Sequence, residues 1–271
     1  MRNAKRTNDI PSSSDLVSLH GKRAIITGSS IGIGKAIAIR FAEAGADLEL
    51  LDIDMDGLKD LKKELSFWQV DVNIHKVDIS KKKEIDDFWN GSIEKEPDIL
   101  VNNAGIYPFK DFLKVDHNFL RKIMDVNLNS VFWMCQQMIR RRIKKGGTII
   151  NVGSIEAILP FKEDMAHYDV SKAGVLALTR ALAKDYGKKG FRVNAIIPGG
   201  ILTPGTKNAA KKILHFQLGL IKSGVEFRTR LPIGRFGKPD EIARMALVLA
   251  SDLSSYVHGA LIVVDGGFLS A

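Results

Sequence analysis

The sequence predicts an α/β protein whose seven-stranded, mostly parallel sheet is covered by helices on both faces. Short runs rich in Val, Ile and Leu alternate with helical segments along the whole chain, and no linker interrupts them. Strands that are apolar throughout, rather than at every second position, are typical of a parallel sheet buried on both sides. A chain of 271 residues can form one domain or two, and the absence of a linker favours a single domain over residues 19–271.

The strands are expected where several apolar residues follow one another. In chain order these runs are residues 22–27, 46–51, 73–77, 98–102, 147–152, 191–197 and 260–264. The helices are expected where apolar residues recur every three or four positions. The clearest are residues 35–44, 117–142, 169–186 and 239–250. Residues 1–18 fall outside this alternation and mix charges with a Pro-Ser-Ser-Ser stretch, so we expect a disordered tail without a signal-peptide core.

A glycine-rich turn follows the first strand and reads Gly28-Ser-Ser-Ile-Gly32-Ile-Gly34. Glycines let a backbone turn tightly and approach a pyrophosphate, whose charge the N–H groups of a helix start can meet. The spacing differs from the Gly-x-Gly-x-x-Gly of the general dinucleotide fingerprint. A merely flexible loop is the alternative, but the flanking strand and helix favour a doubly wound Rossmann fold that binds a dinucleotide.

Asp52 ends the second strand, about twenty residues beyond the glycines, where a carboxylate suits a ribose diol. The same carboxylate would repel a 2′-phosphate. Ile53 follows it instead of a basic residue, and the turn between Gly28 and Gly34 contains no Lys or Arg. The sequence therefore predicts NAD rather than NADP, although Asp54 and Asp56 leave open a merely acidic loop.

Tyr168 and Lys172 stand four residues apart, so a helix would place the phenol beside the ammonium. A fixed cation favours the phenolate, and we expect it to lower the pKa of Tyr168 towards working pH. Such a phenol can give a proton to a carbonyl oxygen or take one from an alcohol. Taken alone the spacing is weak, and a tyrosine packed on a helix would explain it. Ser154, fourteen positions before Tyr168, could hold the same oxygen.

Together these motifs resemble the short-chain dehydrogenase/reductase family in its ordinary single-domain form, from about Gly21 to Phe268. Further stretches match in order and spacing: Asp78-Ile79, Asn102-Asn-Ala-Gly105, Asp-Val-Asn127-Leu, Pro198-Gly-Gly-Ile-Leu-Thr203 and Val264-Asp-Gly-Gly267. The resemblance implies cofactor contacts from Gly28, Ser30, Ile31, Gly32, Ile33, Gly34, Asp52, Ile53, Asp78, Ile79, Asn103, Ala104, Gly105, Tyr168, Lys172, Pro198, Gly199, Ile201 and Thr203.

The resemblance also implies a catalytic set of Asn127, Ser154, Tyr168 and Lys172 in an NAD-dependent enzyme acting on CH–OH donors. Tyr168 would be the general base in oxidation and the acid in reduction, while Ser154 holds the substrate oxygen. Lys172 would keep Tyr168 acidic and bind the ribose, Asn127 would position a water between Lys172 and solvent, and Thr203 would orient the carboxamide. Singly, Ser154 could be a strand-end hydroxyl and Asn127 a packing amide.

The substrate is less well defined by the sequence. Glu156 could meet a hydroxyl group, and Glu156-Ala-Ile-Leu-Pro-Phe resembles the corresponding stretch of bacterial glucose dehydrogenases of the family. A sugar or polyol such as glucose is therefore preferred. A 3-oxoacyl thioester reductase and a non-catalytic NAD(H)-binding protein remain alternatives. The basic segment 205–231 could attract an anionic substrate, but a solvated pair of amphipathic helices is the favoured interpretation.

The net charge of +9 raises nucleic acid as a partner. The basic clusters Arg140–Lys145 and Lys81–Lys83 lie at expected helix ends without an aromatic stacking pattern, so no nucleic acid is expected. No apolar run approaches the length of a membrane span, so no membrane contact is expected. The resemblance implies a homotetramer built through the helices near residues 117–142 and 169–186.

Cys135 is the single cysteine, so an intrachain disulfide is excluded and a reducing, cytoplasmic location is expected. It stands in an apolar helix, where a buried core thiol is the favoured interpretation. The six histidines show no metal-ligand spacing, and no metal site is predicted. His167 adjoins Tyr168, but a structural or surface histidine is the better interpretation.

Overall fold

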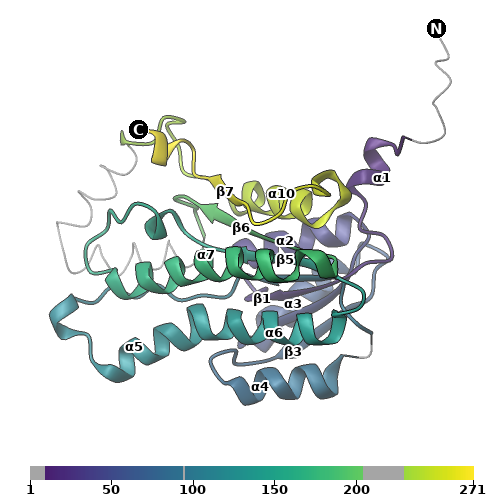
Figure 1. Cartoon of the computed structure of the whole chain (residues 1–271), viewed down its shortest axis with the longest axis horizontal. Coiled ribbons are helices and arrows are strands. Elements are labelled where there is room, and N and C mark those ends of the chain that lie inside the picture. Colours follow the sequence, from purple (N-terminus) through teal and green to yellow (C-terminus); the bar gives the residue numbers. More distant parts are fainter. Residues whose placement is uncertain (1–9, 94, 204–228) are drawn as a thin grey trace, which may run out of the picture.

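The computed structural model describes residues 10–93, 95–203 and 229–271, which form a parallel sheet between two layers of helices (Figure 1). The seven strands lie in the order β3-β2-β1-β4-β5-β6-β7, and every neighbouring pair is parallel. Their bounds are β1 Arg23–Thr27, β2 Asp47–Asp52, β3 Val72–Lys76, β4 Ile99–Asn102, β5 Gly147–Val152, β6 Phe191–Pro198 and β7 Leu261–Val264. The predicted doubly wound sheet is thus confirmed.

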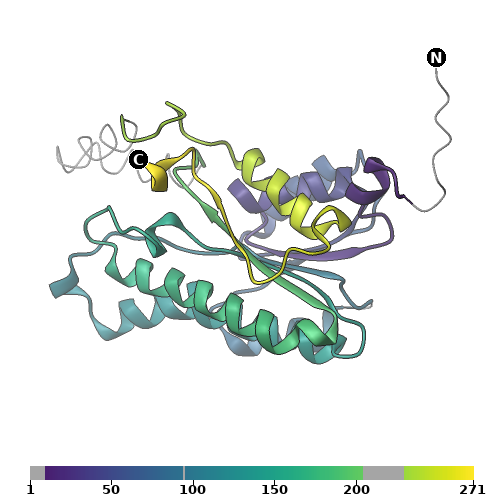
Figure 2. The same ribbon diagram turned by 45° about the horizontal axis from the view of Figure 1, so that its top comes forward.

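Helices cover both faces of the sheet, as Figure 2 shows with α10 and α2 above it and α5, α6 and α7 below it. One face carries α2 (Gly32–Glu43), α3 (Met55–Leu65) and α10 (Pro239–Ala250). The other carries α4 (Lys82–Asp87), α5 (His117–Met124), α6 (Ser130–Arg142) and α7 (Ala166–Tyr186). No helix among residues 10–93, 95–203 and 229–271 is both long and apolar enough to cross a bilayer.

The central strands bury residues on both sides, which explains why they are apolar throughout. Along β1, Ile26 belongs to the core beneath α2, α3 and α10, while Ile25 belongs to the core beneath α4, α6 and α7. Successive side chains of a strand point to opposite faces. An alternating polar residue in β1 would therefore lie in one of the two cores.

The strand order reverses between β1 and β4, because the chain moves outward through β2 and β3 before returning to the far side of β1. In open parallel sheets a ligand crevice forms at such a reversal, outside the carboxyl ends of the strands. The residues that follow β1, β4, β5 and β6 meet at that edge.

Three local predictions need correction. The tail contains a helix, α1 (Ser13–Val17), because Ser12 and Asp15 satisfy each other's backbone N–H groups as a capping box at 3.1 Å. Residues 1–9 of the tail lie outside the described part of the chain. Helix α2 begins at Gly32 rather than at Lys35. The helix expected over residues 117–142 is divided into α5 and α6 by a π-helical turn, Asp125–Asn129.

Candidate active site

The turn after β1 has no room for side chains at two of its glycines. A Cβ atom on Gly28 would lie 2.7 Å from the Cα of Ala104, and one on Gly34 would lie 2.1 Å from the carbonyl oxygen of Gly28. Gly28 and Gly32 also have φ values of +64° and +63°, in the left-handed region that favours glycine. The predicted close backbone approach is therefore a property of the structure.

Thr27 and Asn103 fix this turn to the end of β4. The Thr27 hydroxyl oxygen accepts from the N–H groups of Asn103 and Ala104 at 3.0 and 3.1 Å. In return, the Asn103 amide donates to the carbonyl oxygens of Thr27 and Gly28 at 3.0 and 2.9 Å. No side chain among the described residues caps α2 at Ile31, which leaves the first N–H groups of that helix for an anion.

A cavity of about 630 Å³ extends from this turn to the ends of β2 and β3. Asp52 lines it, and its two carboxylate oxygens accept from the N–H groups of Ser30 and Asp54, each at 3.0 Å. Each oxygen keeps a further lone pair for a ligand hydroxyl. The predicted cofactor residues that line this cavity are Gly28, Ser30, Ile31, Gly32, Ile33, Asp52, Ile53, Asp78, Ile79, Asn103, Ala104, Gly105 and Thr203.

A second cavity of about 190 Å³ adjoins the first and shares Ile33, Asn103, Gly105, Tyr107 and Thr203 with it. We call it the substrate cavity. The predicted residues Ser154, Glu156, Tyr168, Lys172, Pro198, Gly199 and Ile201 all line it. The residues that follow β4, β5 and β6 and the start of α7 are thus brought to one place. A bound dinucleotide fits the two cavities, because the glycine turn and Asp52 lie in one and the proton-transfer residues in the other.

Ser154 and Tyr168 are joined by a hydrogen bond between their side chains. The Ser154 hydroxyl oxygen also accepts from the N–H group of Glu156 at 3.2 Å. Ser154 is therefore both a strand-end hydroxyl that caps a turn and a partner of the phenol. An oxygen atom of a ligand could be held by both hydroxyl groups.

Lys172 does not acidify Tyr168 in this structure, and that prediction is wrong for the protein without ligands. Burial raises the pKa of Tyr168 to about 12, its hydrogen bond to Ser154 opposes the rise, and the negative charge of Glu156 adds to it. The Lys172 ammonium lies 6.0 Å from the ring centroid of Tyr168 and donates instead to the carbonyl oxygen of Val152 at 2.8 Å. Burial also lowers the pKa of Lys172 to about 8.

Asn127 lies behind the substrate cavity in the π-helical turn and is fully buried. Its amide oxygen accepts from the N–H group of Ile106 at 2.8 Å, and its nitrogen donates to the Ile106 carbonyl at 2.8 Å and to the Ser171 hydroxyl at 3.1 Å. A Cβ atom on Gly105 would lie 3.3 Å from the Asn127 amide oxygen and 3.4 Å from the Lys172 nitrogen. Asn127 therefore anchors the segment after β4 beside Lys172.

The residues after β6 close the substrate cavity next to the glycine turn. Thr203 lines both cavities, and a Cβ atom on Gly32 would lie 3.5 Å from it. A Cβ atom on Gly199 would lie 2.6 Å from the Cα of Asp265, in the predicted C-terminal turn. The basic segment predicted after Thr203 lies outside the described residues up to position 228.

Tyr107, Lys162 and Met165 also line the substrate cavity, although no motif identified them. The Tyr107 ring packs edge-on against Tyr168, with centroids 6.3 Å apart. Its position just after the strand-end glycine, Gly105, is the signal that could have found it. Lys162 and Met165 lie between β5 and α7, in a stretch without periodicity, and nothing in the sequence marks them.

His167 and Cys135 have structural positions. The His167 ring nitrogen Nε2 lies 2.7 Å from the carbonyl oxygen of Pro108, and the ring packs on Phe119 at 4.9 Å. Cys135 is buried in α6, and burial raises its pKa to about 12, so it is a core thiol as predicted. Residues 10–93, 95–203 and 229–271 contain no cluster of three or more His, Cys, Asp or Glu suited to a metal ion.

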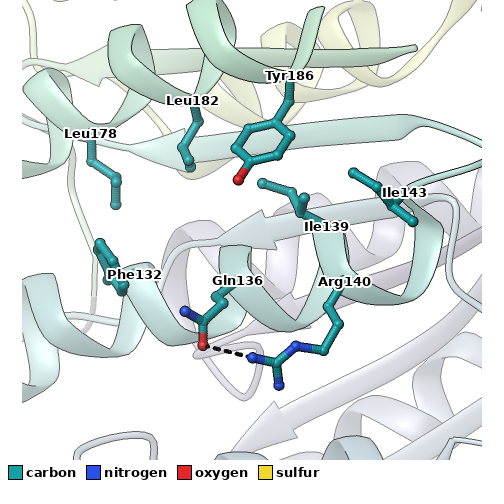
Figure 3. Close-up of a pocket in the computed structure, with 8 residues that line it drawn as sticks. All are labelled: Phe132, Gln136, Ile139, Arg140, Ile143, Leu178, Leu182 and Tyr186. Atoms are coloured by element: carbon teal, nitrogen blue, oxygen red, sulfur yellow. Dashed lines mark hydrogen bonds between the residues drawn. The ribbon is translucent and has the colours of Figure 1, made fainter. Parts of the chain in front are cut away.

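A separate groove of about 280 Å³ lies between α6 and α7 (Figure 3). It contains none of the predicted site residues. Its lining, mostly apolar, is Phe132, Gln136, Ile139, Arg140, Ile143, Leu178, Leu182 and Tyr186. We call it the α6–α7 groove.

Comparisons with known proteins agree with one another. The family model described as Enoyl-(Acyl carrier protein) reductase matches residues 28–269. The 3-oxoacyl-(acyl-carrier-protein) reductase of Thermotoga maritima is 36% identical over 254 residues, 93% of this chain and 99% of that protein. The L-rhamnose-1-dehydrogenase of Scheffersomyces stipitis is 36% identical over 257 residues, 92% of this chain and 96% of that protein.

Among solved structures, the L-sorbose reductase of Gluconobacter frateurii, complexed with NADPH and L-sorbose, is similar with a TM-score of 0.87 at 31% identity. The similarity covers 94% of this chain and 99% of that one. Both cavities lie within the matched range.

Proposed function

Because the chain belongs to the short-chain dehydrogenase/reductase family, we propose that Tyr168 exchanges a proton with the substrate oxygen in an NAD-dependent interconversion of a secondary alcohol and a ketone. Membership makes the chain an oxidoreductase acting on alcohols and carbonyl compounds with a nicotinamide cofactor. The observation that carries the proposal is the hydrogen-bonded pair Ser154–Tyr168 in a cavity that adjoins the glycine turn.

The residues divide the work by position. Tyr168 would hold the proton at its phenolic oxygen, and Ser154 would donate a hydrogen bond to the same substrate oxygen. Lys172 would bind a ribose hydroxyl and supply positive charge below its pKa of about 8. Asn127 would hold the segment beside Lys172 and position a water towards it. Hydride chemistry belongs to the nicotinamide cofactor, whereas these side chains supply geometry and charge.

NAD is proposed over NADP. The larger cavity is lined by three aspartates, Asp52, Asp54 and Asp78, against a single lysine, Lys122. This charge balance suits an unmodified ribose and opposes a 2′-phosphate. The similar L-sorbose reductase holds NADPH, so the preference rests on these carboxylates and not on the family.

A sugar or polyol is the proposed substrate class. Glu156 lines the substrate cavity as a buried carboxylate, which a polyhydroxylated ligand can use and an aliphatic chain cannot. The names of the L-rhamnose dehydrogenase and the L-sorbose reductase support this choice. Reduction of a 3-oxoacyl thioester is the second candidate, favoured by the reductase of Thermotoga maritima.

An assembly of four copies and a cytoplasmic location are further proposals. The α6–α7 groove is apolar, and Phe132 in it is 44% exposed, which supports burial of this face against a second copy. The single cysteine, buried in the core, is compatible with a reducing compartment.

The proposed activity is tested with a panel of secondary alcohols, aldoses and polyols and NAD, followed by the absorbance of NADH. We expect turnover of at least one aldose or polyol. A titration of NADH by fluorescence then separates an inert binder from an enzyme. Tight NADH binding without turnover of any panel member would contradict the enzymatic proposal and favour a dinucleotide-binding protein without catalysis.

A further inference from the structure

Lys162 lies in the wall of the substrate cavity, close to Glu156. We propose that Lys162 and Glu156 together select substrates that carry a second hydroxyl group one or two carbons from the reacting carbinol. The inference rests on the proposed oxidoreductase function and adds to it the chemical group that the site recognises.

Glu156 is a buried carboxylate with unused capacity. Its side chain is 4% exposed, and the N–H group of Phe161 donates to its oxygen Oε2 at 3.1 Å. The N–H group of Lys162 also faces this carboxylate. The other oxygen, Oε1, is buried and accepts no hydrogen bond from the described residues. A buried acceptor left without a donor costs about 1–3 kcal/mol, so a donor from the substrate would be bound strongly.

Lys162 supplies the opposite half of the pair. Its ammonium lies 3.8 Å from Glu156 Oε1 and 5.2 Å from the ring centroid of Phe161. That separation is an ion pair but exceeds the length of a hydrogen bond. The Lys162 side chain is 39% exposed, so its flexible arm can move aside when a ligand approaches Oε1.

A hydroxyl group matches this pair better than other polar groups do. It donates one hydrogen bond and accepts others, so it can donate to Oε1 and accept from the ammonium at the same time. An oxygen atom about 2.8 Å from both groups fits beside a pair separated by 3.8 Å. A substrate carboxylate at this place would be repelled by Glu156, and an amine by Lys162.

The pair lies next to the reacting oxygen. Glu156 is two residues after Ser154, and its own N–H group donates to the Ser154 hydroxyl at 3.2 Å. Ser154 in turn is bonded to Tyr168. A substrate whose carbinol oxygen is held by these two hydroxyl groups therefore presents its neighbouring carbons to Glu156 and Lys162. Sugars and polyols carry hydroxyl groups there, whereas the methylene beside a 3-oxo group offers none.

The test compares substrates that differ by that hydroxyl alone. The two matched pairs are 1,2-cyclohexanediol with cyclohexanol, and glucose with 2-deoxyglucose. In the unaltered enzyme we expect kcat/KM to be at least about tenfold higher for the diol and for glucose, because a site built around a hydroxyl rejects the analogue that lacks it. In Lys162→Met and Glu156→Gln we expect that ratio to fall below about threefold, with kcat/KM for cyclohexanol little changed.

Lys110→Met is the matched control. Lys110 also lies over a phenylalanine, Phe119 at 4.5 Å, and pairs with a carboxylate, Asp116 at 2.7 Å, but it lines neither cavity. It should leave the hydroxyl preference intact.

A preference that is absent from the unaltered enzyme, or that survives in both Lys162→Met and Glu156→Gln, would overturn the inference while cyclohexanol turnover upholds the oxidoreductase. Failure to oxidise any of the four alcohols despite NADH binding would overturn the proposed function, and the inference with it.

Discussion

Tyr168 and Lys172 are both buried, and burial drives both towards their neutral forms, with pKa values of about 12 and about 8. A neutral phenol is the form that donates a proton to a carbonyl oxygen. The free protein is therefore prepared for reduction, whereas oxidation needs the phenol to lose its proton first. Glu156 strengthens this bias, because its negative charge also raises the pKa of Tyr168.

The pH dependence of the two directions should differ accordingly. Below the raised pKa of Tyr168, the phenolate fraction grows with each pH step, so kcat/KM for alcohol oxidation should rise from pH ~6 to ~9 without levelling. In carbonyl reduction Tyr168 stays protonated, and kcat/KM should remain level through neutral pH. Initial rates with NAD and NADH across this range measure both. An oxidation profile that levels below pH ~7 would mean that the phenol is acidified before ligands bind.

Replacement of the phenolic hydroxyl should remove turnover while leaving the cofactor site intact. Tyr168→Phe keeps the ring against Tyr107 but loses the proton carrier. We expect kcat to fall at least about 10³-fold, with NADH affinity within about threefold of the unaltered enzyme. The fully exposed Tyr256 offers the control Tyr256→Phe, which should change neither quantity. Substantial residual activity in Tyr168→Phe would reject its proposed role.

The carboxylate at the end of β2 should determine the choice of cofactor. In Asp52→Ala the negative charge facing a 2′-phosphate is removed, so the ratio of kcat/KM with NAD to that with NADP should fall about tenfold or more. Asp56→Ala is the control, since Asp56 lies on the same loop and pairs with Lys59 outside the cavity. An unchanged ratio in Asp52→Ala would remove the physical basis for preferring NAD.

At the scale of elements, the start of α2 is the most constrained segment. Alanine normally favours a helix over glycine by about 1 kcal/mol. At position 34 the added methyl group would meet the Gly28 carbonyl at 2.1 Å, so the backbone of the glycine turn would have to move. Steric exclusion, not helix propensity, therefore decides which residue stands there.

Gly34→Ala should consequently destabilise the protein by about 1–3 kcal/mol and weaken NADH binding at least about tenfold. Thermal unfolding and fluorescence titration measure the two effects. Gly91→Ala is the control, because nothing lies within 4 Å of a Cβ atom at that glycine. A stable Gly34→Ala protein with unchanged NADH affinity would show that the turn does not approach the cofactor.

The π-helical turn at Asp125–Asn129 shows the same principle in a helix. The sequence predicted one continuous helix, since the apolar periodicity runs through the turn. The turn directs Asn127 towards the segment after β4, where three hydrogen bonds fix it. Periodicity reports which face is buried, but it does not report a local change in the hydrogen-bonding register.

At the scale of the whole molecule, the reversal of strand order gathers the site. Residues from the ends of β1, β4, β5 and β6 meet at one edge because all the strands are parallel. The α6–α7 groove lies away from that edge and carries none of the predicted site residues. Catalytic and assembly surfaces are therefore separate, and each can be altered alone.

A charge in the α6–α7 groove should dissociate the proposed assembly. Phe132→Glu places a carboxylate on an apolar face that a second copy would bury, and sedimentation should then report a smaller species. Phe67→Glu alters a phenylalanine that is 84% exposed outside the groove and should leave the assembly unchanged. A monomeric unaltered protein, or an unchanged assembly in Phe132→Glu, would contradict the proposal.

The sequence by itself determined the sheet, the glycine turn and the residues that line the two cavities. These features follow from apolar runs, glycine spacing and short polar motifs at strand ends, which are local properties of the chain. The tertiary structure alone decided the environment of those residues: the raised pKa of Tyr168, the carbonyl partner of Lys172, and the approach of Lys162 to Glu156. Burial and electrostatic fields depend on everything packed around a group, so they cannot be obtained from its neighbours in sequence.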